Sequence, residues 1–375
     1  MPSNAKTNPE GLDAETLRRV LAEFGFPEVL TVRPIRTGTG RSAKFRVEVG
    51  EPAAARTKGG GPDRALLLKC YRLGADDPRS QGSSADRARA RAHAAALAAR
   101  HAVVRALAAE GVPAAVPLAD RRGGTVLILG DQLFELTPLI RGEGWTPSPE
   151  RARDGGKVLR RLHDAGRGLD PGLLERLDRP FGLLAGDPDE SPIEGLDASG
   201  LDTAYLHDTL RDCAARVEGL ALDERTLPPA VVHGDYHPGN MRFTRSGVAG
   251  IFDFDGCRLG FPIEEASLAS VHFSIDRSGK AMADRDPWPD GDLFEAFWRG
   301  YLADGHPVVL AMAEHSARLV PWIAAGAFAI EALAGLRGKA FPRETVSFAA
   351  GVSAWLLDHA EGLGEIVVQA GEPRD

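Results

Sequence analysis

Cysteine is rare in this sequence, which contains only Cys70, Cys213 and Cys257 among its 375 residues. The three cysteines lie far apart and form no CxxC pair, so their spacing excludes a disulfide framework. Isolated thiols of this kind are typical of a reducing compartment, where they serve as small buried side chains. We therefore expect a protein that folds without disulfide bonds.

A long uninterrupted apolar run is also absent. The best candidate, residues 319–335, contains Pro321 and Glu331 and is short for a membrane span. The first twenty residues lack the apolar segment of a secretory signal peptide. The sequence therefore predicts a buried helix at 319–335, no membrane partner and a cytoplasmic protein.

Positive charge is not in excess, because 45 Lys and Arg residues face 53 Asp and Glu residues, for a net charge of −8. A generic nucleic-acid binder is usually strongly basic, so we expect no nucleic-acid partner. An anionic nucleotide would need a local cationic or metal-loaded site. The apolar share of 43% is ordinary for a globular protein, and 375 residues fit one large domain or two lobes. No segment predicts a protein partner.

The pattern of expected secondary structure changes near residue 140. The segments before it predict a helix at 11–26, a long helix at 85–110, and several short apolar strands. After it the pattern is mostly helical, with helices expected at 148–163, 203–218, 264–274, 293–302, 309–336 and 343–363. This order favours an α+β fold with a small antiparallel-sheet N-terminal lobe and a mostly helical C-terminal lobe.

The sequence HGDYHPGN, residues 233–240, concentrates polar groups in one loop. The Asp235 carboxylate can accept a hydroxyl proton, and the amide oxygen of Asn240 can bind a hard cation. Asp253, in the run IFDFDG, would present a second carboxylate at the end of a strand. Mg²⁺ prefers a few such oxygens and keeps substrate phosphates and water as its other ligands. An Asx-turn that merely caps the loop is the alternative interpretation of the first two residues.

Phosphoryl transfer requires positioning and charge neutralisation more than covalent chemistry. The stretch RTGTGRSAKFRV, 36–47, places Gly38 and Gly40 in a turn where the backbone can approach phosphates. Lys69 stands alone in the apolar strand LLLKCY, in a chain where lysines are scarce, and suits the α- and β-phosphates. A plain hairpin turn and a lysine that extends its head to solvent are the alternatives.

Together, HGDYHPGN and IFDFDGCRLG resemble the aminoglycoside phosphotransferase and choline kinase-like family, which shares the protein-kinase fold. Residues 134–145 are similar to the strand and hinge between the two lobes of that family. The resemblance implies a two-lobed protein-kinase-like fold. Residues 1–137 would form the nucleotide-binding lobe, with 1–9 as a loose tail. Residues 138–142 would form the hinge, and 143–375 the helical lobe with the catalytic loop and the acceptor site.

The resemblance also implies residue roles. Asp235 would be the catalytic base, Asn240 and Asp253 the Mg²⁺ ligands, and Lys69 the lysine that contacts phosphate. The hinge that faces the adenine would lie near Pro138 and Ile140; Pro138 lacks an N–H group but can still offer its carbonyl.

Three further residues are possible supporting groups. We expect His233 to hydrogen-bond to the backbone beneath the loop. His237 would contact phosphate or substrate, or else stabilise the loop. Asp255 would act as a hydrogen-bond acceptor next to the metal ligands or would pair with Arg258.

The sequence departs from the family pattern at one position. The family lysine usually pairs with a glutamate on the long helix, and here that position is Arg100, followed by His101. Neither residue can pair with Lys69 as a carboxylate would. Asp86 or another residue takes this role, or the register of the helix differs, or Lys69 is held without such a partner.

These features favour a small-molecule kinase that transfers the γ-phosphoryl group of Mg-ATP, or GTP, to a hydroxyl group of a small acceptor. One alternative is a metallophosphoesterase with His233, Asp235, His237 and Asp253 around two metals. Another is a pseudokinase that binds nucleotide without turnover.

Overall fold

The structure, a computed structural model, describes residues 12–35, 42–50, 64–72, 84–130, 132–178, 183–184, 203–221, 229–275, 288–303, 313–338 and 343–372. The chain divides into two compact units, and each is described by itself. The first consists of Met1–Ala108 and Ala114–Arg141, and the second of Ala109–Pro113 and Gly142–Asp375. The assignment of nucleotide binding to 1–137 and of catalysis to 143–375 stays a prediction.

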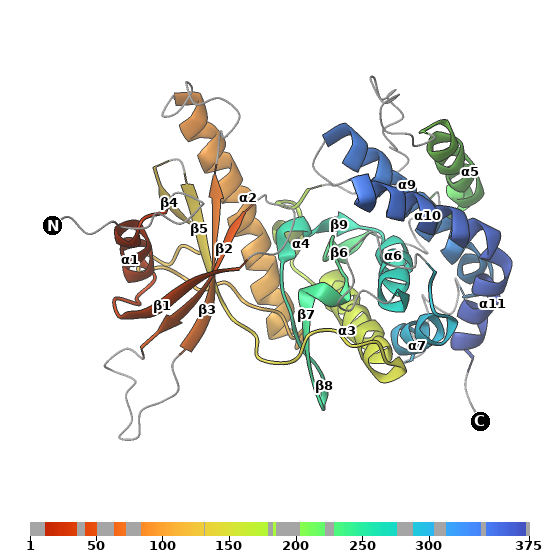
Figure 1. The fold of residues 1–375 in the computed structure, drawn as a ribbon, viewed down its shortest axis with the longest axis horizontal. Helices are drawn as coiled ribbons and strands as arrows, with labels where there is room; N and C mark the ends of the chain where they lie inside the picture. The colour runs from red at the N-terminus through yellow and green to blue at the C-terminus, as the bar shows by residue number, and fades with distance from the viewer. Residues whose placement is uncertain are drawn as a thin grey trace. The chain divides into compact units, whose positions relative to one another are not determined.

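A five-stranded antiparallel sheet forms the centre of the first unit (Figure 1). Its strand order is β1 (Val29–Ile35), β2 (Ala43–Val49), β3 (Arg64–Arg72), β5 (Gln132–Pro138) and β4 (Leu127–Leu129). Two helices accompany the sheet, α1 (Ala14–Glu23) and α2 (Ser84–Ala109). The first begins at Asp13, whose carboxylate accepts a hydrogen bond from the Thr16 backbone N–H at 2.6 Å and so caps the helix.

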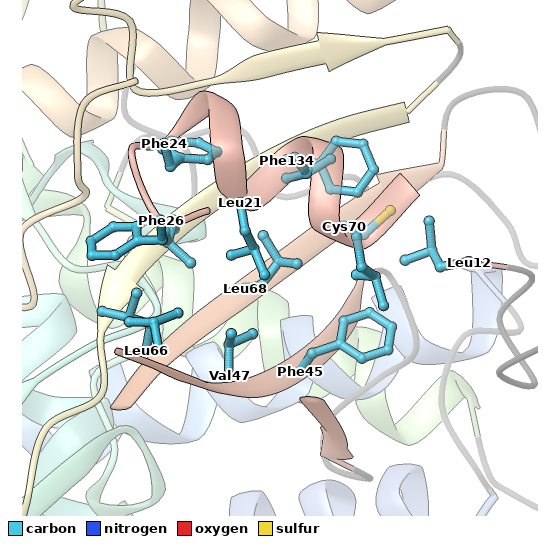
Figure 2. Close-up of a cluster of buried hydrophobic side chains, with 14 residues drawn as sticks. Leu12, Leu21, Phe24, Phe26, Phe45, Val47, Leu66, Leu68, Cys70 and Phe134 are labelled. Carbon is cyan, nitrogen blue, oxygen red and sulfur yellow. The ribbon is translucent and has the colours of Figure 1, made fainter. Parts of the chain in front are cut away.

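The two faces of this sheet have different partners because side chains alternate along each strand. Leu66, Leu68 and Cys70 of β3 join Phe45, Phe134 and the apolar side of α1 in one buried cluster, drawn in Figure 2. The other face carries Tyr71 and Leu133, which pack against Ala94 and Leu97 of α2. Lys69 and Glu135 are two residues away from Tyr71 and Leu133 and therefore point to the side that α2 covers.

Helices dominate the second unit: α3 (Pro149–Arg167), α4 (Pro171–Leu174), α5 (Thr203–Ala221), α6 (Pro262–Ser274), α7 (Gly291–Tyr301), α9 (Ala313–Gly338), α10 (Arg343–Asp358) and α11 (Ala360–Ala370). Two small antiparallel sheets join β6 (Ala230–Val232) to β9 (Arg258–Gly260), and β7 (Met241–Thr244) to β8 (Gly247–Ile251). No helix in the described part of the chain is both long and apolar enough to cross a membrane.

Glycines allow α3 and α7 to pack closely. A Cβ atom on Gly156 would lie 2.1 Å from the Phe297 carbonyl oxygen, and one on Gly300 would lie 1.9 Å from the Arg153 carbonyl oxygen. The same stretch of α3 supports the loop at 233–240, because the Tyr236 hydroxyl donates to the Gly155 carbonyl at 2.7 Å. Any larger residue at 156 or 300 would force the two helices apart.

The predicted antiparallel sheet followed by a mostly helical region is confirmed. One predicted helix is wrong in extent, since 343–363 is interrupted at His359 between α10 and α11. The His359 ring stacks on Trp355 at 4.1 Å, and its Nδ1 lies 2.8 Å from the Trp355 carbonyl oxygen. A side chain that competes for this carbonyl favours a helix end at that point. The three cysteines are buried thiols, as expected.

Candidate active site

The loop 233–240 connects β6 to β7 and is shaped by a close backbone contact. Gly234 adopts φ 81°, a left-handed conformation that favours glycine. A Cβ atom at this position would lie 2.0 Å from the Gly256 carbonyl oxygen. Glycine is therefore required here so that the loop can lie directly against the turn that follows Asp253.

A buried carboxylate, Glu265 at the start of α6, anchors this loop. It accepts hydrogen bonds from the backbone N–H groups of His233 at 3.0 Å and Gly234 at 2.6 Å. It also lies 2.9 Å from His163 Nε2, and the other ring nitrogen of His163 lies 2.8 Å from the Tyr301 hydroxyl. Burial opposes ionisation of Glu265, but His163, His233 and the Gly234 N–H outweigh it and lower the pKa of the carboxyl group. Glu265 was not predicted from sequence, where it is only one of two adjacent glutamates after Pro262.

Replacing Glu265 by Gln should destabilise the protein by on the order of 1–3 kcal/mol, because the amide NH₂ group leaves at least one buried donor without an acceptor. Urea denaturation of the two proteins would measure this change. The same substitution at the exposed Glu361 is the control and should leave the denaturation midpoint unchanged.

The pH dependence provides a second readout of Glu265. Because the folded protein lowers the pKa of this group, its contribution is present above the ordinary value of 4.5 and is lost as the pH falls through the lowered value. Wild type should therefore lose stability in acid more steeply than Glu265→Gln. Equal midpoints and equal acid profiles would contradict the anchoring role.

His233 is fully buried beneath the loop. Its Nε2 lies 3.1 Å from the Phe252 carbonyl oxygen, and its Nδ1 accepts from the Asp235 backbone N–H at 3.3 Å. Burial lowers the pKa of this histidine, which favours a neutral ring with the proton on Nε2. These contacts are the backbone hydrogen bonds that we expected of His233, and they join the loop to the segment before Asp253.

The Asp235 side chain is 56% exposed, and its carboxylate is held from two sides. The Asn240 amide nitrogen donates to Asp235 Oδ2 at 2.9 Å and to the Asp235 carbonyl at 3.0 Å. His237 Nε2 lies 3.5 Å from Asp235 Oδ1. Partial desolvation in the loop would raise the pKa of Asp235, but His237 and Asn240 outweigh it and lower that pKa. The group is therefore ionised at neutral pH and can accept a proton or a hydrogen bond.

Asn240 and Asp253 lie at the same end of one hairpin. Met241 of β7 pairs with Ile251 of β8, and the Phe252 N–H donates to the Asn240 carbonyl at 3.0 Å. Asn240 immediately precedes β7 and Asp253 follows β8, so antiparallel pairing brings the two positions together. Asp253 has φ 70° and is the non-glycine residue with a positive φ among those described. Such backbone strain is concentrated at functional sites.

This set of donors suits a hard cation. Because the Asn240 amide nitrogen donates to Asp235, the amide oxygen is the atom that can bind a metal, and the Asp253 carboxylate is a second oxygen ligand of the same kind. Across the described ranges, no three His, Cys, Asp or Glu side chains gather closely enough to hold a metal ion. Asp255 lies in the short turn Phe254–Gly256, and its supporting role stays a prediction.

Lys69 has a carboxylate partner from the neighbouring strand. The sheet register places Lys69 of β3 opposite Glu135 of β5, and Lys69 Nζ lies 3.3 Å from Glu135 Oε1. His101 of α2 lies 2.9 Å from the other oxygen of Glu135. Burial opposes ionisation of Glu135, but Lys69 and His101 outweigh it and lower its pKa to about 2. Glu135 is thus a carboxylate partner of Lys69 that lies on neither Arg100 nor His101. The side chain of Asp86, the other candidate, lies outside the described residues.

The predicted hinge follows directly from β5. The Leu136 carbonyl accepts from the Leu118 N–H at 2.8 Å, whereas the Leu139 N–H donates to Ala65 of β3 at 3.1 Å. Backbone groups alternate between the two edges of a strand, so the Pro138 carbonyl points to the edge away from β3. The role of this carbonyl in adenine binding stays a prediction. Gly38 and Gly40 lie outside the described residues.

A hollow of about 540 Å³, its open mouth included, lies beside Asp235 in the second unit. Helices α6 and α9 supply much of the lining. Among the lining side chains are Asp235, Arg258, Phe261, Leu268, His272 and Glu331.

A family model described as "Phosphotransferase enzyme family" matches residues 31–314, most of the chain and the candidate site apart from the lining that α9 supplies. The chain belongs to this family. The homoserine kinase of Caulobacter sp. (strain K31) is 30% identical over 150 residues, which cover 40% of this chain and 44% of that enzyme. The match thus spans less than half the length of this relative.

Two solved structures show that the phosphotransferase fold extends over nearly the whole chain. A microcompartment-associated aminopropanol kinase superposes with a TM-score of 0.62 at 16% identity, over 94% of this chain and 99% of that one. An amicoumacin kinase, solved with AMP-PNP and Ca²⁺, superposes with a TM-score of 0.54 at 16% identity over 94% of each chain. The predicted protein-kinase-like family and fold are therefore confirmed.

Proposed function

We propose that this phosphotransferase transfers the γ-phosphoryl group of Mg-ATP, or GTP, to a hydroxyl group of a small acceptor. The observation that carries the proposal is the ionised Asp235 carboxylate, held by Asn240 and His237 and lying at the hollow. Family membership over residues 31–314 supports the same reaction type. The homoserine, aminopropanol and amicoumacin kinases are named for small-molecule acceptors.

In this mechanism Asp235 is the catalytic residue that orients the acceptor hydroxyl and takes its proton as the new O–P bond forms, while the bond from the γ-phosphorus to the bridging oxygen breaks and the nucleoside diphosphate leaves. Asn240 holds the carboxylate in one orientation, so the reacting oxygen is presented in a fixed direction. Asn240 and Asp253 would hold Mg²⁺, which neutralises charge on the phosphates when bound. Lys69 would contact the α- and β-phosphates, and the Pro138 carbonyl and Ile140 N–H would face the adenine.

We further propose a hydroxylated amine of amino-acid size as the acceptor. Phe261 and Leu268 form part of the apolar lining of the hollow. Glu331 and Arg258, which carry opposite charges, also line it. A zwitterionic amino alcohol has an ammonium group that can pair with Glu331 and a carboxylate that can pair with Arg258. The homoserine kinase relative acts on an acceptor of this kind by its name.

An ADP-release assay tests the proposed reaction. The full chain, MgATP and each of homoserine, 1-amino-2-propanol, ethanolamine and choline would be mixed in turn, with GTP as a second donor. Turnover with at least one acceptor is expected. Nucleotide binding without turnover on any hydroxyl acceptor would favour a pseudokinase instead.

Glu331→Gln should raise the KM of the preferred acceptor about tenfold, the equivalent of one charge-assisted hydrogen bond, with little change in the KM of the nucleotide. Steady-state kinetics with each substrate varied in turn would measure both values. The exposed Glu361→Gln serves as the matched control. An unchanged acceptor KM would remove Glu331 from the acceptor site.

A further inference from the structure

A cluster of buried polar side chains in the first unit connects three elements. Lys69 of β3, Glu135 of β5 and His101 of α2 are 3%, 4% and 5% exposed. Lys69 Nζ lies 3.3 Å from Glu135 Oε1, and His101 Nε2 lies 2.9 Å from Glu135 Oε2. The other ring nitrogen of His101 lies 2.9 Å from the Thr125 hydroxyl, just before β4. Both oxygens of one carboxylate are thus occupied, by a lysine on one side and a histidine on the other.

The helix presents His101, and not Arg100, to the sheet. Buried residues recur along α2 at Ala94, Leu97, His101 and Val104, which is the spacing of one helix face. Arg100 is only half-buried and falls off this face. A side chain at 101 therefore meets the strand that carries Glu135, whereas a side chain at 100 does not share that direction.

We propose that Glu135 and His101 are positioning residues for Lys69, and that the carboxylate that holds the phosphate-binding lysine comes from the adjacent strand. Glu135 pairs with Lys69, and His101, itself held by Thr125, keeps the carboxylate from rotating. This inference rests on the proposed function, because it takes Lys69 as the group that contacts the nucleotide phosphates.

The arrangement has a mechanical consequence. Glu135 and Pro138 lie three residues apart on β5, so one strand sets both the lysine and the predicted adenine-facing edge. The Lys69–Glu135 pairing is fixed by the register of β3 and β5. The position of Lys69 therefore depends on the hydrogen-bonded sheet, and α2 contributes through the His101 contact with Glu135.

The test is a double-mutant cycle read as nucleotide affinity. Calorimetry would give the affinities of MgATP and adenosine for wild type, Lys69→Met, Glu135→Gln and the double variant of the full chain. Lys69→Met should reduce the preference for MgATP over adenosine on the order of 10- to 100-fold, the equivalent of one charge-assisted hydrogen bond. Glu135→Gln should reduce it about tenfold, and the double variant should match Lys69→Met alone.

Independent effects of the two substitutions would overturn the inference, because a residue that acts through Lys69 has nothing left to position once Lys69 is gone. Glu48→Gln, the same change on β2 of the same sheet, is the control and should keep the wild-type preference. Glu48 pairs with Arg46 near the surface.

Breaking a buried ion pair is strongly destabilising, so Glu135→Gln could fail to fold. A second variant tests the inference without breaking this pair. Thr125→Val keeps Lys69 and Glu135 and removes only the hydroxyl that holds His101. It should reduce the preference for MgATP a few-fold in wild type and not at all in the Lys69→Met background. An equal reduction in both backgrounds would overturn the role of His101.

The outcomes separate this inference from the proposed function. If the wild-type protein binds MgATP no better than adenosine, both the inference about Lys69 and the kinase proposal are wrong. A wild-type preference for MgATP that survives Glu135→Gln unchanged would overturn the inference and leave the kinase proposal intact.

Discussion

Asp235→Asn is expected to lower kcat by on the order of 10²–10⁴-fold while leaving nucleotide affinity close to wild type. Asparagine has nearly the same shape, and its side-chain oxygen can still accept the hydrogen bond that Asn240 now donates to Asp235 at 2.9 Å. It cannot accept the proton of the acceptor hydroxyl. The substitution therefore removes the proposed base with little change to the shape of the loop.

The measurement is single-turnover and steady-state phosphoryl transfer to the preferred acceptor, together with calorimetric binding of MgATP. Asp212→Asn, on the exposed side of α5, provides the matched control and should keep full activity. Turnover of Asp235→Asn near the wild-type rate would remove Asp235 from the catalytic role. A loss of nucleotide binding in parallel would instead point to a collapsed loop.

The second large effect is expected from Asp253→Asn, which should abolish the Mg²⁺-dependent part of nucleotide binding. At a nucleotide concentration about 100 times Kd, wild type should gain roughly 2.7 kcal/mol of stability from MgATP, or several degrees in Tm. The variant keeps one oxygen but loses the charge that Mg²⁺ favours. Asparagine tolerates the left-handed conformation of Asp253, at φ 70°, so the hairpin should be retained.

Thermal unfolding with ATP, GTP and ADP, each with Mg²⁺ or with EDTA, would measure this effect. In wild type the nucleotide should raise Tm, and EDTA should reduce this increase. In Asp253→Asn the increase in Tm should be as small with Mg²⁺ as it is in wild type with EDTA. Asp212→Asn is again the control. A full Mg²⁺-dependent shift in Asp253→Asn would place the metal elsewhere, and the absence of any shift in wild type would argue against nucleotide binding as such.

Much of the candidate site could be predicted from a short stretch of sequence. Asp235, Asn240 and Asp253 lie within one loop and one hairpin, so their relative positions depend on local backbone geometry. The glycine at 234, the strand on each side of the turn and the polar spacing all belong to the same 23-residue neighbourhood. Local interactions of this kind are encoded by residue type and spacing, which is why the motif resembles its family at the level of sequence.

The partners of these residues could not be predicted in the same way. Glu265 looked like an ordinary acidic residue in the first turn of a helix, yet its carboxylate binds the His233 and Gly234 N–H groups. Glu135 lay in an apolar strand with no local sign that Lys69 would face it. His101 cannot replace a carboxylate, but in the structure it contacts one.

The sequence by itself determined the order of the elements, the family resemblance and the identity of the groups that we propose for the chemistry. Only the tertiary structure decided which side chains hold those groups in place. The physical reason is that strand register and helix rotation are set by burial of the whole apolar face. The contact between Lys69 and Glu135 follows from the pairing of β3 with β5 and from the packing of α2 over that face. The residues next to Lys69 in the sequence specify neither the strand pairing nor the helix packing.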